Sequence, residues 1–572
     1  MRKPMVIGSR GAVLAILLGV APARAGWIPN GAPIIVAPCA ESPTAAVSDA
    51  RGGMYVFWTD NRSCAHDDVF VQRIDGLGSI ATGWPDGGMP VCPPGSGQGS
   101  ALAIPTGNKE AIVVWTDGRS GVQQLYGQRI GPDGGRRWSP EGIRLCDAPS
   151  GQGGFGMLAD GAGGVFAAWM DGRRGLVDDT PRHHPLFDLY AQHLDAQGAR
   201  TWPAMGLAVC TNANVQDTPQ LVSDGGSGVL VTWLDRRGPA DLQHLDASGT
   251  AHLAADGVAI PGRFLGLVAP DGAGGMISAF KYGPDTQQDL YAQRVDSNGA
   301  LVWPMNGVLV AGAAFDQRPS DIVSDGSGGA FIAWHDLRNG TDWDVYVQRI
   351  TTSGAAAAGW PVNGLATCTA PGFQVYPRLT PDLAGGCVLA WYDARDAATA
   401  YDIYAQRITG QGAVADGWPA NGAALCVASG DQTLPLPVPD GSGGALVAWS
   451  DYRVYADVYA QHVSGSGGVG EPGAVVSVGT PGPSPLALGP VFPNPLTGRT
   501  LTVTLSLPDA APAELSLTDL QGRRLARASV PAGALGSIAI RFKTPDGLSP
   551  GVYLIRLGQA GRVVSRRLSI LR

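Results

Sequence analysis

A five-residue motif, Trp-x-Asp-x-Arg, recurs along the chain, and this repetition constrains the fold more than any other feature. Its seven copies have their anchors at Trp58, Asp60 and Arg62; Trp115, Asp117 and Arg119; Trp169, Asp171 and Arg173; Trp233, Asp235 and Arg237; Trp334, Asp336 and Arg338; Trp391, Asp393 and Arg395; and Trp449, Asp451 and Arg453. A degenerate eighth copy lies at Phe280–Tyr282, and successive copies are 47 to 64 residues apart. Self-similarity at such a period indicates a repeat architecture in which each repeat is one supersecondary unit.

Each repeat contains four short segments with the pattern of β-strands, and the copy around Trp334 is the best preserved. Residues 319–325 lead into the turn 326–329, whose glycines tolerate the positive φ of a tight hairpin. The apolar run 330–334 predicts a buried strand, and residues 344–350 alternate as a half-buried strand does. A fourth segment ends at Cys368. Four strands per repeat, without helical periodicity, predict an all-β fold made of four-stranded β-propeller blades.

The two ends of the repeat region complement each other. Residues 27–39 have the pattern of a fourth segment with no first three segments before them. The last repeat ends at Val463 and has no fourth segment of its own. We therefore expect residues 27–39 to complete the eighth blade and to close an eight-bladed propeller over residues 26–463, which removes open sheet edges. An open solenoid with an unpaired strand at each end is the alternative.

Residues 1–25 have the pattern of a secretory signal peptide. Arg2, Lys3 and Arg10 precede the apolar run 12–20, and residues 23–25 form a small-x-small cleavage site. The apolar run is too short to span a bilayer, and no later segment approaches about 18 consecutive apolar residues. We expect a protein that passes through the periplasm and ends outside the cell or on its outer surface.

Charge is distributed unevenly along the chain. The formal net charge is −8, but residues 483–572 carry +7 and residues 26–482 carry −19. An acidic propeller argues against nucleic acid or an anionic membrane as a partner, and it is compatible with a cation, a glycan or a protein. The 83 glycines and 44 prolines fall at repeated turn positions, and a hydrophobic content of 44% is sufficient for a core.

Eight cysteines in an exported chain raise the question of disulfides. Six of them end the fourth segments of their repeats, namely Cys39, Cys92, Cys146, Cys210, Cys368 and Cys426. Equivalent positions in separate blades exceed the Cα separation of roughly 7 Å that a disulfide allows, so most should be small buried hydrophobic residues. Cys64 lies in a loop at the same end of its blade as Cys92. We predict a Cys64–Cys92 disulfide; pairing of Cys64 with Cys39, or no disulfide, are the alternatives.

After Val463 the composition shifts to that of a linker and then to a second domain. Residues 464–487 are rich in Gly, Pro and Ser. Beyond them, alternating segments predict a small β-sandwich, with strands at residues 501–507, 514–519, 538–542, 552–557 and 563–571. Turn-like residues at 519–523 and 549–551 separate some of these strands.

Four motifs in residues 488–572 resemble the type A sorting domain of type IX secretion. They are Phe492-Pro493-Asn494-Pro495, the turn at 519–523, the strand beginning Gly551-Val552-Tyr553, and the basic tail 566–572. The resemblance implies an immunoglobulin-like sandwich similar to that of flagellar hook-capping proteins, and it implies that the secretion machinery is a partner. The propeller repeats resemble those of uncharacterised secreted bacterial proteins that end in such domains, which implies no activity. A sandwich without an export role is the alternative.

The repeated Trp, Asp and Arg residues are expected to be scaffold, because an active site is a single constellation. Asp60 and Arg62, with their equivalents, should bond to each other and to nearby backbone, and the tryptophans should pack between blades. Asp271, Asp325 and Asp440 in the Gly-rich turns could bind calcium. Each turn supplies only one carboxylate, however, so turn stabilisation is preferred.

Deviations from the repeat are the better guide to a binding site. The third repeat inserts residues 176–185, and this insertion contains Asp178, Asp179, His183 and His184, which are residue types that bind calcium or another divalent cation. A tolerated surface insertion is the simpler interpretation. The fourth and fifth repeats have lost parts of the repeat motif, which indicates either repeat decay or a recognition face specialised in this sector.

The sequence nominates no catalytic or cofactor-binding residue. It contains no Gly-x-Ser-x-Gly elbow, His-Glu-x-x-His helix or phosphate-binding Gly-Lys-Ser/Thr loop. The favoured function is non-catalytic binding of a glycan or a protein through the loop face of the propeller. The alternatives are a secreted glycan-active hydrolase or lyase with carboxylates in the central funnel, and a structural or adhesive surface component.

Overall fold

The computed structural model describes residues 26–572 except 38, 96, 108, 176–186, 214, 236–239, 261–265, 285–286, 397–399, 454, 471–486, 493–499, 508–510, 520, 522, 531–535, 546–547, 561 and 571–572. The chain divides into two compact units, Met1–Val475 and Val476–Arg572. The described residues form strands and turns, which confirms the predicted all-β class. No helix in this part of the chain is long and apolar enough to cross a membrane.

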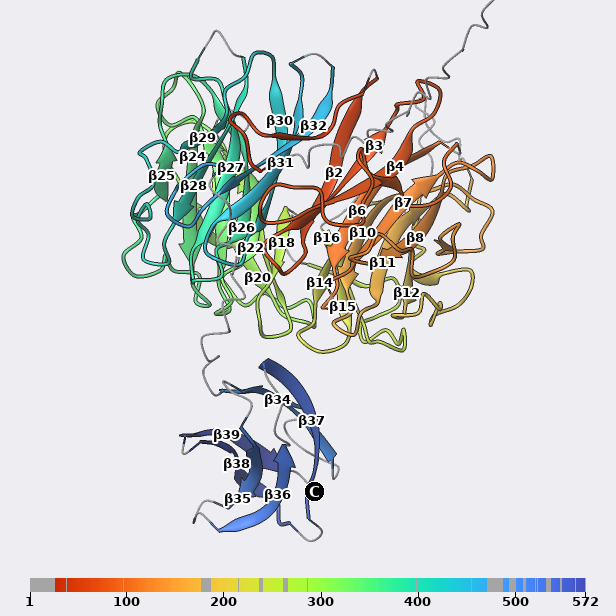
Figure 1. Ribbon diagram of the computed structural model, residues 1–572, viewed down its shortest axis with the longest axis vertical. Helices are drawn as coiled ribbons and strands as arrows, with labels where there is room; N and C mark the ends of the chain where they lie inside the picture. The colour runs from red at the N-terminus through yellow and green to blue at the C-terminus, as the bar shows by residue number, and fades with distance from the viewer. Residues whose placement is uncertain are drawn as a thin grey trace, which may run out of the picture. The chain divides into compact units, whose positions relative to one another are not determined.

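Eight four-stranded antiparallel sheets make up the first unit, and we number these propeller-like blades one to eight in chain order (Figure 1). The first strands of blades one to eight are β2 (Glu41–Ser48), β6 (Gln98–Pro105), β10 (Gln152–Ala159), β14 (Gln216–Ser223), β18 (Leu267–Pro270), β22 (Gln317–Ser324), β26 (Gln374–Pro381) and β30 (Gln432–Pro439). The second strands are β3 (Met54–Asp60), β7 (Ala111–Asp117), β11 (Val165–Asp171), β15 (Val229–Asp235), β19 (Met276–Tyr282), β23 (Ala330–Asp336), β27 (Cys387–Asp393) and β31 (Ala445–Asp451).

The outer half of each blade follows in the same order. The third strands are β4 (Asp68–Ile74), β8 (Gln124–Ile130), β12 (Asp188–Leu194), β16 (Ala240–Leu245), β20 (Asp289–Val295), β24 (Asp344–Ile350), β28 (Asp402–Ile408) and β32 (Asp457–Val463). The fourth strands are β5 (Met89–Pro90), β9 (Ile143–Arg144), β13 (Leu207–Cys210), β17 (Val258–Ala259), β21 (Val308–Ala311), β25 (Leu365–Cys368), β29 (Ala423–Cys426) and, in blade eight, β1 (Ala32–Ile35).

Blade eight combines strands from both ends of the repeat region. Strand β1 pairs antiparallel with β32, with Ala32 opposite Ala460, as the sequence predicted for residues 27–39. Arg453 Nη2 donates a hydrogen bond to the carbonyl of Asn30 at 2.8 Å. The first strands contact one another in series from β2 to β30, and β30 also contacts β2, which Figure 1 shows as red beside cyan.

The apolar core lies between neighbouring blades. The anchor tryptophans at the ends of the second strands, including Trp58 and Trp115, are 0% exposed. One buried cluster joins Tyr55 and Phe57 of blade one to Val113 and Trp115 of blade two. Burial of each indole contributes roughly 4–6 kcal/mol at the usual free energy per apolar area. The repeat therefore folds as an array, because no blade buries its tryptophan alone.

The anchor Asp and Arg hold the loop that follows each second strand. In blade one, Trp58 Nε1 donates to Asp60 Oδ2 at 2.6 Å, and Arg62 Nε donates to Asp60 Oδ1 at 2.7 Å. The Trp–Asp and Arg–Asp bonds recur in blades two, three, six, seven and eight. In blade four, Trp233 Nε1 has no partner among the described residues, which exclude Arg237.

The predicted Cys64–Cys92 disulfide is wrong, and Cys64 instead bonds to Cys39, the alternative partner. Their Cα atoms are 5.9 Å apart. The physical reason lies in the packing of Cys92, which is buried and whose Sγ accepts a hydrogen bond from Arg119 Nη2 of blade two at 3.1 Å. The other described cysteines are free and buried, namely Cys146, Cys210, Cys368, Cys387 and Cys426.

The hairpin between the first and second strands carries a second set of ion pairs, at the opposite end of each blade. Asp271 Oδ1 accepts a hydrogen bond from the Gly275 amide at 2.8 Å, and Asp271 Oδ2 accepts one from Arg294 Nε at 2.8 Å. Asp325 is bonded in the same way to Arg349, and Asp440 to His462. These carboxylates therefore stabilise turns, as predicted from the sequence.

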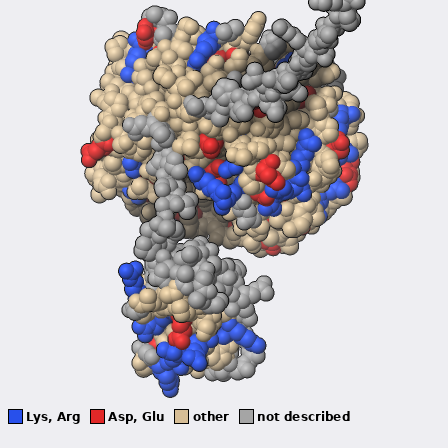
Figure 2. Space-filling view, in the orientation of Figure 1, with Lys and Arg blue, Asp and Glu red and all other residues tan. Residues whose placement is uncertain are grey.

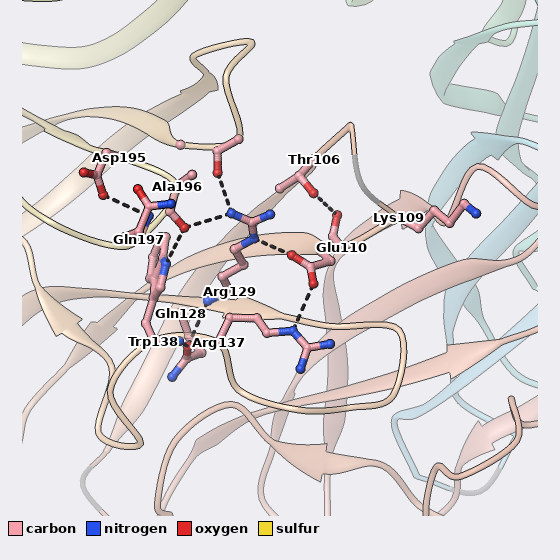
Figure 3. A network of polar contacts seen from close by, with 12 residues as sticks. Thr106, Lys109, Glu110, Gln128, Arg129, Arg137, Trp138, Asp195, Ala196 and Gln197 are labelled. Carbon is pink, nitrogen blue, oxygen red and sulfur yellow. Dashed lines mark hydrogen bonds and ion pairs between the residues drawn. The ribbon is translucent and has the colours of Figure 1, made fainter. Parts of the chain in front are cut away.

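Blade two builds its hairpin network from a glutamate. Glu110 Oε1 accepts from Arg137 Nε at 2.9 Å, and Glu110 Oε2 pairs with Arg129 (Figure 3). Arg129 Nη1 also donates to the carbonyls of Gly163 and Ala196 in blade three. The Arg129 side chain, on the third strand of blade two, therefore bridges blades two and three at this end.

The second unit consists of two antiparallel sheets. One contains β33 (Ala487–Phe492), β34 (Thr500–Leu507) and β37 (Gly536–Lys543), and the other contains β36 (Arg524–Val530), β35 (Ala513–Thr518), β38 (Gly551–Gln559) and β39 (Arg562–Ile570). Their buried residues, including Val503, Leu517 and Leu557, form one cluster. Lys and Arg side chains outnumber acidic ones on the face of this unit seen in Figure 2. Pro493, Asn494 and Pro495 of the predicted sorting motif lie outside the described residues.

Candidate functional site

A β-bulge in the first strand re-aims one side chain in blades two, four, seven and eight. The bulge residues Ser100, Thr218, Tyr376 and Leu434 have positive φ and are exposed. The strand registers shift at these positions, as between Val375 and Arg378 in β26. Bulges commonly redirect a side chain away from the regular pleat. In each of these blades the first strand begins with a glutamine, and the variable residue stands two positions after it.

A second variable residue lies between the Trp and the Asp of the repeat, at the same end of the blade. Its side chain contacts the first strand of its own blade or the first strand of the next blade. Ser450 Oγ of blade eight lies 3.5 Å from Ser42 Oγ of blade one, and the ring of His335 in blade six lies 5.3 Å from the ring of Tyr376 in blade seven. In blades one to four this residue is Thr59, Thr116, Met170 or Leu234, whereas in blades six and seven it is His335 or Tyr392.

These positions form a continuous aromatic strip across blades six and seven, which we define as Trp343, His335, Tyr376, Tyr392 and Tyr401. The ring centroids are 4.8 Å apart from Trp343 to His335 and 5.4 Å apart from Tyr376 to Tyr392. Tyr401 follows Tyr392 at 6.0 Å. Such separations fall within the range of favourable aromatic pairs. The ring of Tyr376 in the middle of the strip is 57% exposed.

His335 supplies a neutral, buried hydrogen-bonding group to the strip. Its Nδ1 lies 2.9 Å from Ser320 Oγ. Burial, and secondarily the charge of Arg318, lowers the pKa of His335 to about 4. Ser320 Oγ and Nδ1 of the neutral ring share one hydrogen bond, whose direction depends on the tautomer of His335. A base with so low a pKa is a poor proton acceptor at neutral pH, so the arrangement suits binding better than proton abstraction.

Asp321 ties the two blades together beneath the strip. Its Oδ2 accepts a hydrogen bond from the Leu379 amide of blade seven at 2.9 Å. Burial raises the pKa of this carboxyl. At the edge of the strip, the Arg318 guanidinium lies 4.8 Å from the ring centroid of Trp343 and pairs with Asp316 at 2.9 Å. The strip is thus fixed by contacts on both blades, as a preformed binding surface requires.

None of the site residues predicted from the sequence lies in this strip. The predicted metal ligands, Asp178, Asp179, His183 and His184, lie outside the described residues. Among the residues that the structure describes, no group of three or more His, Cys, Asp or Glu side chains is placed to hold a metal ion. The signal that could have found the strip is the variable residue after each anchor Trp, which becomes His or Tyr only in blades six and seven.

No protein-family model matches the chain, and no curated protein matches it. The solved structures that it resembles include a protein of unknown function from Dyadobacter fermentans, with 10% identity and a TM-score of 0.32 over 63% of this chain and 92% of that one. An ulvan lyase, described as a new family of polysaccharide lyase, has 11% identity and a TM-score of 0.35 over 78% and 95%. An endo-arabinase from Bacteroides thetaiotaomicron has 13% identity and a TM-score of 0.25 over 47% and 96%. At these TM-scores the likenesses identify no family.

Proposed function

We propose that the protein binds a carbohydrate chain on the aromatic strip of blades six and seven. The observation that carries the proposal is the unbroken series of rings from Trp343 to Tyr401, with Tyr376 exposed in its middle. The negative face of an aromatic ring attracts the polarised C–H groups of a sugar ring, and tyrosine hydroxyls bind sugar hydroxyls. Ser320, whose hydroxyl is hydrogen-bonded to His335, adds a polar group beside the rings.

The experiment is a binding titration of the mature chain, residues 26–572, against oligosaccharides that a glycan array selects. We predict that Tyr376→Ala weakens binding about tenfold, because one stacking contact is worth about 1.4 kcal/mol. Tyr376→Phe should retain most of the affinity. Tyr455→Ala, which alters a similarly exposed tyrosine on blade eight outside the strip, is the control. Unchanged binding by Tyr376→Ala, or no glycan binding at all, would overturn the proposal.

We infer that the eight blades close into one ring. This inference is supported by the pairing of β1 with β32 and by the contact between β2 and β30. A closed ring holds the first strands of blades six and seven at fixed separation, which the aromatic strip needs.

For the second unit we propose a sorting role at the outer membrane, with an immunoglobulin-like sandwich as its fold. The four motifs of residues 488–572 support this role, and Tyr553 anchors one of them by donating its hydroxyl to the Ser549 carbonyl at 2.8 Å. The test is the intact mass of the native protein from culture medium and from washed cells. Loss of residues beyond about 483, as expected for a removable sorting domain, would support the role. Retention of the tail through Arg572 in both fractions would contradict it.

A further inference from the structure

The degenerate repeat of blade five carries a cation at the position that holds an aromatic residue in blades six and seven. Phe280-Lys281-Tyr282 stands where other blades have Trp-x-Asp, so Lys281 occupies the variable position that carries His335 and Tyr392 in the next two blades. The side chain of Lys281 is exposed at the end of β19. Although burial opposes it, the hydrogen bond from Arg318 and the charge of Lys281 hold the pKa of Asp316 below its usual range. Strand β19, which carries Lys281, contacts β22, which carries Arg318 of blade six.

A third cation lies on blade seven. Arg378 is exposed on β26, two residues after Tyr376. In the pairing of β26 with β27, Arg378 stands opposite Ala390, two residues before Tyr392 of the aromatic strip. Lys281, Arg318 and Arg378 thus lie on three successive blades, five, six and seven, and the last two of these blades carry the aromatic strip.

Two of these cations differ from most others in the first unit. The arginines of the repeat are bonded to aspartates, as Arg395 is to Asp393 at 2.6 Å. In the part of the chain that the structure describes, neither Lys281 nor Arg378 has an ion-pair partner. Lys281 and Arg378 act on Asp316 and Asp321 through their charge, without a direct ion pair to either carboxylate. Exposed cations without an ion pair, close to the exposed Tyr376, indicate a ligand that brings its own negative charges.

We propose that the carbohydrate is an anionic polysaccharide, whose carboxylate or sulfate groups bind to Lys281, Arg318 and Arg378 while its sugar rings stack on the aromatic strip. This inference rests on the proposed function and names its ligand class. Arginine binds planar carboxylates and sulfate oxygens through paired hydrogen bonds, and several weak contacts along one chain add to each other. The overall negative charge of the unit repels such a polymer elsewhere, which confines binding to this cluster of cations.

The experiment compares charged and uncharged forms of the same polymer, with the full mature chain. Hexagalacturonate against its methyl ester tests carboxylates, and dextran sulfate against dextran tests sulfates. We expect one charged form to bind at least about tenfold more tightly than its neutral partner. Raising the salt from about 50 to about 500 mM should weaken that binding, because exposed charges are screened.

Variants locate the charge recognition. Arg378→Gln and Lys281→Gln should each reduce binding of the charged form several-fold and leave that of the neutral form unchanged. Arg51→Gln, which removes an exposed arginine in the hairpin of blade one at the other end of the blades, is the matched control and should bind as the parent does. An equal loss in Arg51→Gln and Arg378→Gln would overturn the inference, because it would indicate non-specific attraction.

Two further outcomes separate this inference from the proposed function. If neutral glycans bind to the strip as tightly as charged ones, or if only neutral glycans bind, the inference fails and the proposed function stands. If neither the charged nor the neutral forms bind, and the glycan array is blank, the proposed function fails and takes this inference with it.

Discussion

At the residue scale, Glu41 occupies a position that is glutamine in six other blades. Those glutamines open the first strands and brace the segment that enters each strand, as Gln374 Nε2 does by donating to the Gly372 carbonyl at 2.9 Å. A carboxylate has no proton to donate. Glu41 is 0% exposed, and neither of its side-chain oxygens has a hydrogen-bond partner among the described residues. Burial, together with Asp60 and Asp457, raises the pKa of Glu41 to about 8.

This pKa makes stability depend on pH. The native state binds the Glu41 proton more tightly than the unfolded state, whose pKa is the ordinary 4.5, so the free energy of unfolding falls as the pH rises from 4.5 to about 8. We predict that Glu41→Gln removes this loss, which is on the order of 4 kcal/mol across that window. Urea denaturation at both ends of the window measures it. Gln374→Glu should create a similar loss in blade seven. An identical pH slope for parent and Glu41→Gln would contradict the account.

At the element scale, strand β1 is held to the repeat array by a covalent bond as well as by pairing. The Cys39–Cys64 disulfide links the segment after β1 to the loop between β3 and β4, and the two cysteines are 25 positions apart in the sequence. β1 is the strand that gives blade eight its fourth member. The bond therefore secures the position where the two ends of the repeat region meet.

Loss of this bond should weaken that meeting point. We predict that the double variant Cys39→Ser/Cys64→Ser lowers the free energy of unfolding by about 3 kcal/mol, because an open loop of this length gains chain entropy in the unfolded state. Amides of β1 should exchange hydrogen faster in the variant. Cys146→Ser, at a free buried cysteine, is the comparison for loss of a thiol alone. Non-reducing peptide mapping that found Cys64 bonded to Cys92, or free, would refute the pairing.

The strands could be predicted from the sequence because their signals are local. Alternating residues and Gly-rich turns located the four strands of each blade, and the orphan segment at residues 27–39 predicted the pairing of β1. Strand β36 (Arg524–Val530) was missed, since its mostly small apolar residues are interrupted by Arg527 and Ser529 and do not alternate regularly. The disulfide partner of Cys64 could not be chosen, because the path of the chain between Ile35 and Cys39 decides which thiol faces it.

At the scale of the whole molecule, the two ends of the blades have different roles. Paired charges occupy the hairpin end, where Glu110, Arg129 and Arg137 form one network. The aromatic strip and the cations Lys281, Arg318 and Arg378 occupy the other end in blades five to seven. The sequence could not predict this asymmetry, because His335 and Tyr376 are 41 positions apart and meet only when blades six and seven pack. A consensus of the eight repeats keeps only the shared residues, so it omits the variable positions that form the proposed site.

The most direct test is a crystal structure of the mature chain with a bound oligosaccharide. The account predicts sugar rings stacked on Tyr376 and its neighbours in the aromatic strip, with the acidic groups of the sugar directed at Arg378 and Lys281. Oligosaccharide bound at the hairpin end of the blades, or on the second unit with the strip left bare, would contradict it.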